Sequence, residues 1–221
     1  MPEKNNVTEI SVRPYQEIDR EAVRKIFCDT AFMGQPMELF FDDRQIMGDL
    51  LTLYYTDYEP ESLFVAECAG RIVGCLTGCT DSARKKRIWS RKLFFRIFFR
   101  LLNKGLIFKR KTSRLLFYLA RSFFKGEFNR PGIPREYPAH FHINIHNNYR
   151  RLQAGTKLLA AFFEYLRKKN IHGVYAATFS EQGRRFFQES GFILLWERKN
   201  SQWHYLLNRD VKTSLFAILL D

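Results

Sequence analysis

The sequence predicts an α/β fold, a mixed and mostly antiparallel twisted sheet flanked by helices and interrupted by a basic helical insertion. Segments with alternating apolar residues and segments with apolar residues at helical spacing follow one another along the chain. A hairpin is signalled in the first half, and the excess positive charge is concentrated in one stretch. With 221 residues, 46% of them hydrophobic, the chain can form its own core, so wholesale disorder is excluded. We expect a single domain over residues 1–221, with residues 82–135 as the insertion.

The first half of the chain predicts two helices among three strands. Residues 9–13 alternate as a strand does, Pro14 ends them, and residues 18–28 carry apolar side chains at helical spacing. A second helix is expected over residues 44–55. Residues 63–68 and 72–80 then form a hairpin around a turn that contains Gly70.

The second half alternates strands and helices. We expect strands over residues 140–146, 174–179 and 192–198, with a last one over residues 203–207. Helices are expected over residues 154–169 and 181–190, and Gly191 suits the C-terminal cap of the latter. An α/β sheet of mixed direction follows from this order.

Four cysteines are present without a CxxC pair, which favours a reducing compartment over a disulfide scaffold. The N-terminal residues contain no apolar stretch typical of a secretory signal, and Arg96 and Arg100 interrupt the longest apolar run. We expect a cytoplasmic protein that does not span a membrane, although it can lie on the surface of one.

Residues 143–159 carry the most informative local pattern. A strand runs through a polar turn directly into a helix whose start is small and basic. The free backbone N–H groups and the positive dipole end of such a helix can hold a phosphate. An ordinary strand-to-helix connection explains this segment taken alone equally well.

Three segments together resemble the GCN5-related N-acetyltransferase (GNAT) superfamily. Arg150-Arg151-Leu152-Gln153-Ala154-Gly155 resembles the turn that binds the pyrophosphate of acetyl-CoA, with Gln153 at the position of its first glycine. Residues 10–26 look like the superfamily's first strand and helix, and residues 185–192 like its motif B. The resemblance implies that acetyl-CoA is the co-substrate. It also implies these contacts to it: Ile143, Asn144, Ile145, Arg150, Arg151, Leu152, Gln153, Ala154, Gly155, Thr156 and Ser180.

The strand before the pyrophosphate turn supplies the candidate base. Period two places His140, His142, Asn144 and His146 on one face. In the superfamily this strand lines the acceptor site, so His142 is the first choice for the base and His140 the second, with Glu67 a minor candidate. A zinc site lacks an obvious third ligand other than His146, and we expect no metal. A purely structural, hydrogen-bonded row stays open.

An acidic and aromatic section over residues 40–59 falls where the superfamily places the loop and helix that shape the acceptor pocket. Carboxylates and tyrosine rings there suit an amine acceptor. A solvated surface helix is the plainer interpretation of the same residues.

The basic insertion carries 17 basic residues and one acidic residue between residues 84 and 135, a net charge of +16, so the remaining 169 residues carry −3 of the total +13. Residues 92–104 and 114–125 have wide apolar arcs with cationic edges. Three interpretations stay open: helices packed on the domain, a module on an anionic membrane surface through residues 84–125, or a lid that recruits an anionic acceptor or the CoA phosphate. Nucleic acid is disfavoured because no known binding motif accompanies the charge.

The sequence thus predicts an acetyl-CoA-dependent N-acetyltransferase that acts by direct attack of an amine in a ternary complex. The residue at the motif B tyrosine position is Phe187, which cannot protonate the departing thiolate. Phe187 and Gln153 therefore support an alternative, a catalytically weak acyl-CoA-binding or membrane-surface module with the same fold. The acceptor and the oligomeric state are left open by the sequence.

Overall fold

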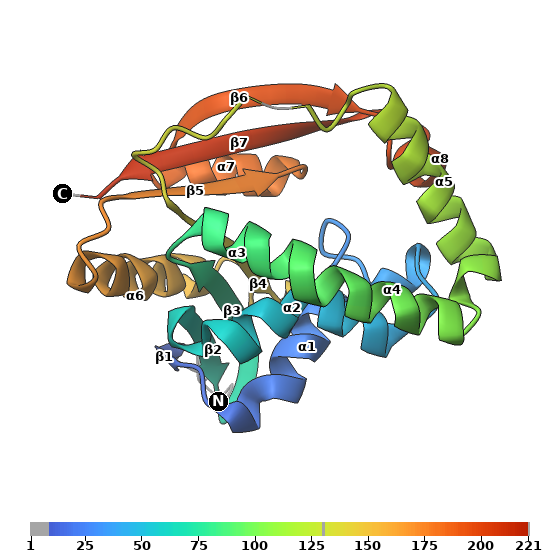
Figure 1. Cartoon of the computed structure of the whole chain (residues 1–221). Coiled ribbons are helices and arrows are strands. Elements are labelled where there is room, and N and C mark those ends of the chain that lie inside the picture. The colour runs from blue at the N-terminus through green and yellow to red at the C-terminus, as the bar shows by residue number, and fades with distance from the viewer. Residues whose placement is uncertain (1–8, 130, 221) are drawn as a thin grey trace, which may run out of the picture.

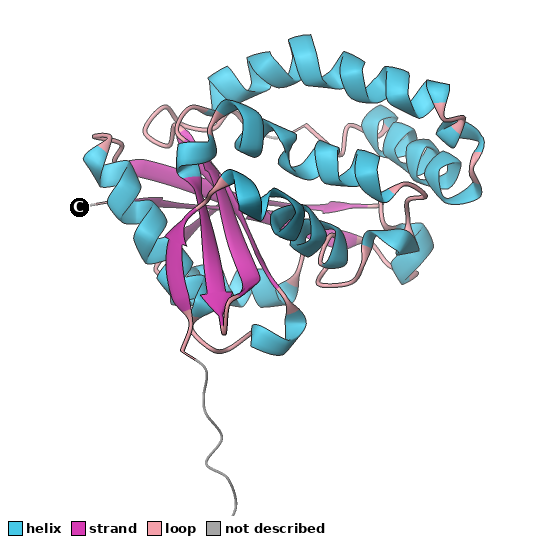
Figure 2. Ribbon diagram, turned by 90° about the horizontal axis from the view of Figure 1, so that it is seen from below, coloured by secondary structure: helices cyan, strands magenta, loops and turns pink. Residues whose placement is uncertain are grey.

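The computed structural model describes residues 9–129 and 131–220, which form one seven-stranded sheet with helices on both faces (Figures 1 and 2). The strand order is β1-β2-β3-β4-β5-β7-β6. Every neighbouring pair is antiparallel except β4 and β5, which are parallel. The strands are β1 (Ser11–Pro14), β2 (Leu63–Cys68), β3 (Arg71–Cys79), β4 (Ala139–Ile145), β5 (Gly173–Thr178), β6 (Ile193–Asn200) and β7 (Val211–Leu219). The predicted mixed, mostly antiparallel sheet is confirmed.

Two helices cover one face of the first sheet half, α1 (Arg20–Asp29) and α2 (Arg44–Tyr58). The opposite face is covered by α6 (Ala154–Lys168), whose apolar stripe inserts Leu158, Phe162 and Leu166 against the sheet. The Phe162 ring lies so close to β3 that a Cβ on Gly78 would come within 2.2 Å of it. Further along this face lies α7 (Glu181–Glu189), which packs Phe187 into the same core.

The basic segment, residues 82–135, leaves β3 and runs across α2 toward the far end of β6 and β7 (Figure 1). It forms α3 (Ser82–Ile88), a π-helical turn (Trp89–Leu93), α4 (Phe94–Asn103) and α5 (Arg110–Phe124). Leu93 in the π-helical turn and Ile97 in α4 are buried. The middle of α5 contacts α8 (His204–Leu207), where the rings of Tyr118 and Tyr205 stack 4.7 Å apart.

The predicted strand over residues 203–207 is wrong. Residues 204–207 form the short helix α8, and Trp203 is buried against Phe32 and Phe40. The last strand is β7, which the prediction missed. It lies between β5 and β6 and carries the continuous buried run Ser214–Ala217.

Candidate active site

The strands β4 and β5 separate soon after they pair. Only Ala139 with Val174 and His140 with Tyr175 are in register between them, whereas β4 stays paired with β3 from His140 to Ile145. Beyond His140, the backbone N–H and C=O groups of β4 that point toward β5 therefore have no hydrogen-bond partner on β5. A cleft of ≈ 1360 Å³ opens at this point. The volume exceeds that of ordinary small-ligand pockets and suits a long ligand.

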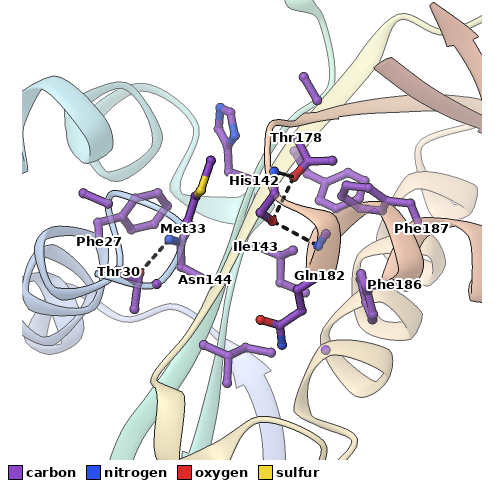
Figure 3. A pocket seen from close by; sticks show the side chains of 18 of the residues that line it. Phe27, Thr30, Met33, His142, Ile143, Asn144, Thr178, Gln182, Phe186 and Phe187 are labelled. Carbon is purple, nitrogen blue, oxygen red and sulfur yellow. Dashed lines mark hydrogen bonds between the residues drawn. The ribbon is translucent and has the colours of Figure 1, made fainter. Parts of the chain in front are cut away.

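The cleft has two halves, separated by β4 (Figure 3). Phe27, Met33 and His142 lie on the side of α1 and α2, whereas Phe186 and Phe187 lie on the side of α7. Asn144 donates a hydrogen bond to Thr30 Oγ1 at 2.7 Å and so ties β4 to the end of α1. We call the first half the α1–α2 side and the second the α6–α7 side.

Most of the residues expected to contact acetyl-CoA line this cleft together. They are Ile143, Asn144, Ile145, Arg150, Arg151, Gln153, Ala154, Gly155, Thr156 and Ser180. Leu152 is not among the lining residues and is 44% exposed. Ser180 caps α7 by accepting a hydrogen bond from the Gly183 N–H at 3.0 Å.

The turn before α6 has an unusual backbone. Arg151 and Gln153 have φ angles of 64° and 60°, in the left-handed region that favours glycine. Gln153 is the N-cap of α6, and its carbonyl accepts the Lys157 N–H at 3.0 Å. The turn thus keeps the conformation of a glycine turn although Gln153 replaces the glycine. The first N–H groups of α6 have no helical acceptor, as at any helix start, and Ala154, Gly155 and Thr156 line the cleft.

Gly155 has a packing role. A Cβ there would lie 3.0 Å from the Phe186 ring and 3.4 Å from Ile145. A larger residue would push α7 away from α6, so glycine fixes the width of the α6–α7 side.

Arg150 connects the two sides of the cleft. Its guanidinium donates to Ile145 O at 3.3 Å and to Gln182 Oε1 at 2.8 Å, and it lies against Gly34. No carboxylate among the described residues forms an ion pair with it. Partial burial lowers its pKa, so an anionic ligand would find a poorly solvated cation here. Arg151 and Arg185 also line the cleft.

Four polar side chains converge at the inner end of the α1–α2 side. His140 Nε2 lies 3.2 Å from His142 Nε2 and 3.3 Å from Lys85 Nζ, and Lys85 also donates to Tyr55 Oη. Because an ammonium can only donate, the simplest assignment has His140 accept at Nε2. His140 Nδ1 then donates to Cys79 Sγ at 3.0 Å.

The two predicted bases differ in access. His142 is exposed and lines the cleft, whereas His140 is buried behind it and does not line the cleft. The deep cleft excludes much of the bulk water around His142, and this desolvation, together with the charge of Lys85, lowers the pKa of its imidazole. His142 is therefore neutral near pH 7. His146 lies at the outer end of β4 and its Nδ1 has no partner among the described residues.

Glu67 lies apart from the histidines. It sits on β2 at a bulge, pairs in register with Ser11, and accepts a hydrogen bond from Arg13 Nε at 3.1 Å. It is not among the residues that line the cleft.

The expected acidic acceptor pocket does not form. The carboxylates of residues 40–59 are held by partners on other elements: Asp42 by Thr112, Asp43 by Lys104, Asp49 by Arg24 and Arg100, Asp57 by Arg20, and Glu59 by Tyr54 and Thr80. None of these carboxylates lines the cleft. Residues 40–59 do reach the cleft through Leu50, Leu51, Tyr54 and Tyr55, so the expected tyrosine rings line it and the carboxylates do not. With Phe27, Met33 and Trp89 these side chains make the α1–α2 side mainly apolar and aromatic.

Lys85 is the site residue that sequence reasoning missed. It lies on α3 and is the charged side chain on the α1–α2 side of the cleft. Burial lowers its pKa to about 8. Nothing in the sequence distinguishes it among the 17 basic residues of the segment, because only the path of α3 over α2 brings it to His140. The described residues contain no group of three or more metal-ligating side chains, and no described helix is long and apolar enough to cross a bilayer.

No family model matches the sequence, and no curated protein matches it. Solved structures do match along nearly the whole chain. A protein named SsHAT is 20% identical with a TM-score of 0.66, and the match covers 96% of this chain and 99% of that one. The polyamine N-acetyltransferase of Drosophila melanogaster, which forms N-acetylagmatine, is 14% identical with a TM-score of 0.60 over 96% and 100%. A Salmonella typhimurium protein assigned as an acetyltransferase and solved with its cofactor acetyl-CoA is 14% identical with a TM-score of 0.58 over 96% and 94%.

These neighbours share the arrangement of sheet and helices at identities that establish the fold and not the activity. The separated parallel strands, the glycine-like turn and the cleft at the start of α6 all lie within the matched length. The chain has the fold of the GNAT superfamily.

Proposed function

We propose that this chain is an N-acetyltransferase that moves the acetyl group of acetyl-CoA to an amine by direct attack in a ternary complex. The observation that carries the proposal is the cleft at the separation of β4 and β5, which ends on the first turn of α6. Its free strand edge suits the amide-containing arm of acetyl-CoA, and its helix start and arginines suit the pyrophosphate.

The α6–α7 side would hold the co-substrate. The free edge of β4 at residues 143–145 can pair with the amides of the pantetheine arm as an added strand does. The N–H groups of Ala154–Thr156, with Arg150 and Arg151, would hold the pyrophosphate. Acetyl-CoA supplies an activated carbonyl and a thiolate leaving group.

His142 would take the proton of the acceptor amine. It faces the cleft, is neutral near pH 7, and is held by His140, which acts as a positioning residue. On the opposite side, Phe187 is 4% exposed and packs on Phe141 and Phe192, so it offers no proton to the thiolate. Water is the natural acid in its place.

The α1–α2 side favours an acceptor with an apolar body over a polyamine. Aromatic and aliphatic side chains line it, and its cation Lys85 has no ion-pair partner among the described carboxylates. A second positive charge on the acceptor would be repelled, whereas a carboxylate would be bound. Agmatine, linked by name to two structural neighbours, should therefore be a poor acceptor here.

The test is release of the CoA thiol from acetyl-CoA over a panel of matched amines. Phenylalanine, phenethylamine, agmatine and spermidine separate the contributions of the carboxylate and of extra cationic groups. We expect phenylalanine to exceed agmatine at least about tenfold in kcat/KM, a difference of 1.4 kcal/mol. If agmatine is the best acceptor, the proposed acceptor class is refuted, but acetyl transfer to an amine is not. Binding of acetyl-CoA without turnover of any amine favours the second candidate, an acyl-CoA-binding module, which Phe187 and Gln153 support.

A further inference from the structure

The outer faces of α4 and α5 expose large apolar side chains. All nine phenylalanines of the chain that are at least 40% exposed lie in the basic segment: Phe94, Phe95, Phe98, Phe99, Phe108, Phe117, Phe123, Phe124 and Phe128. The other thirteen phenylalanines of the chain are buried or half-buried. Soluble proteins rarely gather apolar surface in this way without a partner for it.

Folding does not require these rings to point outward. The opposite face already packs on the body, through Leu93 in the π-helical turn and Ile97 on α4, and through Leu115 on α5. On α4 the exposed rings contact one another, with Phe94 and Phe98 stacked at 5.9 Å. At 100° per residue, the exposed Phe94, Phe95, Phe98, Phe99 and Leu102 fall within a single arc of 140°.

Basic side chains flank the apolar arcs. Lys92 and Arg96 follow the arc of α4, and Arg114, Arg121 and Lys125 lie beside that of α5. Arg100 and Lys104 pair with Asp49 and Asp43, but Arg96, Lys109 and Arg110 form no ion pair with a described carboxylate. The carboxylate of Glu127, the one acidic residue between 84 and 135, accepts hydrogen bonds from the Ser201 N–H and hydroxyl and lies 3.8 Å from Lys125 Nζ.

We propose that residues 91–125 bind the surface of an anionic lipid bilayer through this face. A bilayer places a layer of negative headgroups directly beside an apolar layer, the same order as cations beside phenylalanines on each helix. A second copy of the chain would bring one +16 segment against another, which repulsion disfavours. Each basic residue near the headgroups contributes about 1 kcal/mol, and the rings add apolar burial. The acetyl-CoA cleft plays no part in this binding.

Flotation of the full-length protein with vesicles tests the proposal. Phosphatidylcholine vesicles are compared with vesicles that also contain about 30% phosphatidylserine, a typical anionic surface. We expect the protein to float with the anionic vesicles at least about tenfold better, and salt to weaken binding. Equal flotation on both compositions, or none on either, overturns the proposal.

Two double variants test whether vesicle binding depends on the exposed phenylalanines of α4 or on any exposed apolar side chain. Phe95→Ser with Phe99→Ser removes rings that are 53% and 57% exposed on α4, so folding should be unaffected. Ile193→Ser with Leu194→Ser is the matched control, because these β6 residues are 56% and 47% exposed outside the segment. The first pair should lose flotation about tenfold and the second should not. Circular dichroism and acetyl-CoA binding verify that each variant is intact. Flotation equal to wild type in the first pair, or salt-resistant self-association in its place, contradicts the proposal.

Discussion

His142 combines access to the cleft with a pKa below its ordinary value. The period of β4 predicted which face His142 occupies, but the desolvated cleft and Lys85 that lower its pKa come from the assembled structure. A base that is already neutral at pH 7 needs no deprotonation, so its own titration should not limit activity near pH 6.5.

Replacing His142 by Asn should lower kcat about 10²–10⁴-fold, the usual contribution of a general base. Acetyl-CoA affinity should be unchanged, since the side chain lies on the other side of β4. The wild-type pH profile of kcat should lack a fall centred at 6.5. His204→Asn, at an exposed histidine on α8, is the control. A profile that rises with a midpoint near pH 8 and disappears in Lys85→Met would transfer the role of base to Lys85.

Gln153 holds a left-handed conformation that glycine adopts without strain. Gln153→Gly should raise the free energy of unfolding by about 1 kcal/mol, because an L residue loses roughly that much in this region. Gln153→Ala, which keeps the strain, is the matched control. Chemical denaturation and acetyl-CoA titration measure both variants. A loss of stability in Gln153→Gly, or an equal gain in the alanine variant, would contradict the strained turn.

Lys85 is a partly buried cation without a carboxylate partner among the described residues. Its folded pKa of about 8 lies below its ordinary 10.5, so the unfolded chain binds more protons between these values and stability should rise with pH across that window. Protonated Lys85 is thus unfavourable at pH 7. Lys85→Met should raise the free energy of unfolding at pH 7 by about 1–2 kcal/mol. This is less than the free energy that corresponds to the full pKa shift, because the side chain is half-exposed and solvent screens its charge.

Activity gives an independent readout for the same variant. Lys85→Met should lose the preference for acceptors with a carboxylate, seen as a higher KM for phenylalanine relative to phenethylamine. Lys86→Met, at an exposed neighbour on α3, should change neither stability nor KM. Unchanged selectivity in Lys85→Met would leave that lysine a structural role only.

The attachment of α4 to α2 depends on Asp49. This carboxylate is 6% exposed and accepts hydrogen bonds from Arg24 and Arg100. Asp49→Asn should lower the free energy of unfolding by about 1–3 kcal/mol, less than for fully buried pairs because both arginines reach solvent. Asp57→Asn, which breaks a more exposed pair with Arg20, should cost at most about 1 kcal/mol. Equal thermal stability of the two variants would show that Asp49 does not anchor α4.

Most elements were predictable because their patterns are local. The hairpin of β2 and β3 and the stripe of α6 have the periods that strands and helices require. The pattern of residues 203–207 fits a strand as well as a helix because the apolar run is short, and burial of Trp203 against Phe32 favours the helix. The prediction of an acidic acceptor pocket was wrong for a different reason. The basic residues that pair with the carboxylates of residues 40–59 come from elements distant in sequence, such as Arg100 and Lys104 of the α4 region.

The charge of the molecule divides between two parts of the chain that have different roles. A body of charge −3 carries the cleft, and a segment of charge +16 wraps α2, contributes Lys85 to the cleft and presents its phenylalanines outward. The sequence predicted the division itself. It could not predict that one segment both lines the cleft and leaves an unpartnered face, because both depend on how α3, α4 and α5 lie on the body (Figure 1).

The proposed activity requires that the cleft at the start of α6 binds acetyl-CoA for transfer to an amine. Isothermal titration of acetyl-CoA into the full-length protein measures this binding. Arg150→Ala, which removes the guanidinium spanning the cleft, is compared with Lys168→Ala, whose side chain is 72% exposed at the far end of α6. We expect saturable one-to-one binding that Arg150→Ala weakens about tenfold, through loss of a charged contact, and that Lys168→Ala leaves unchanged. Absence of saturable binding by the folded protein would contradict the proposed activity.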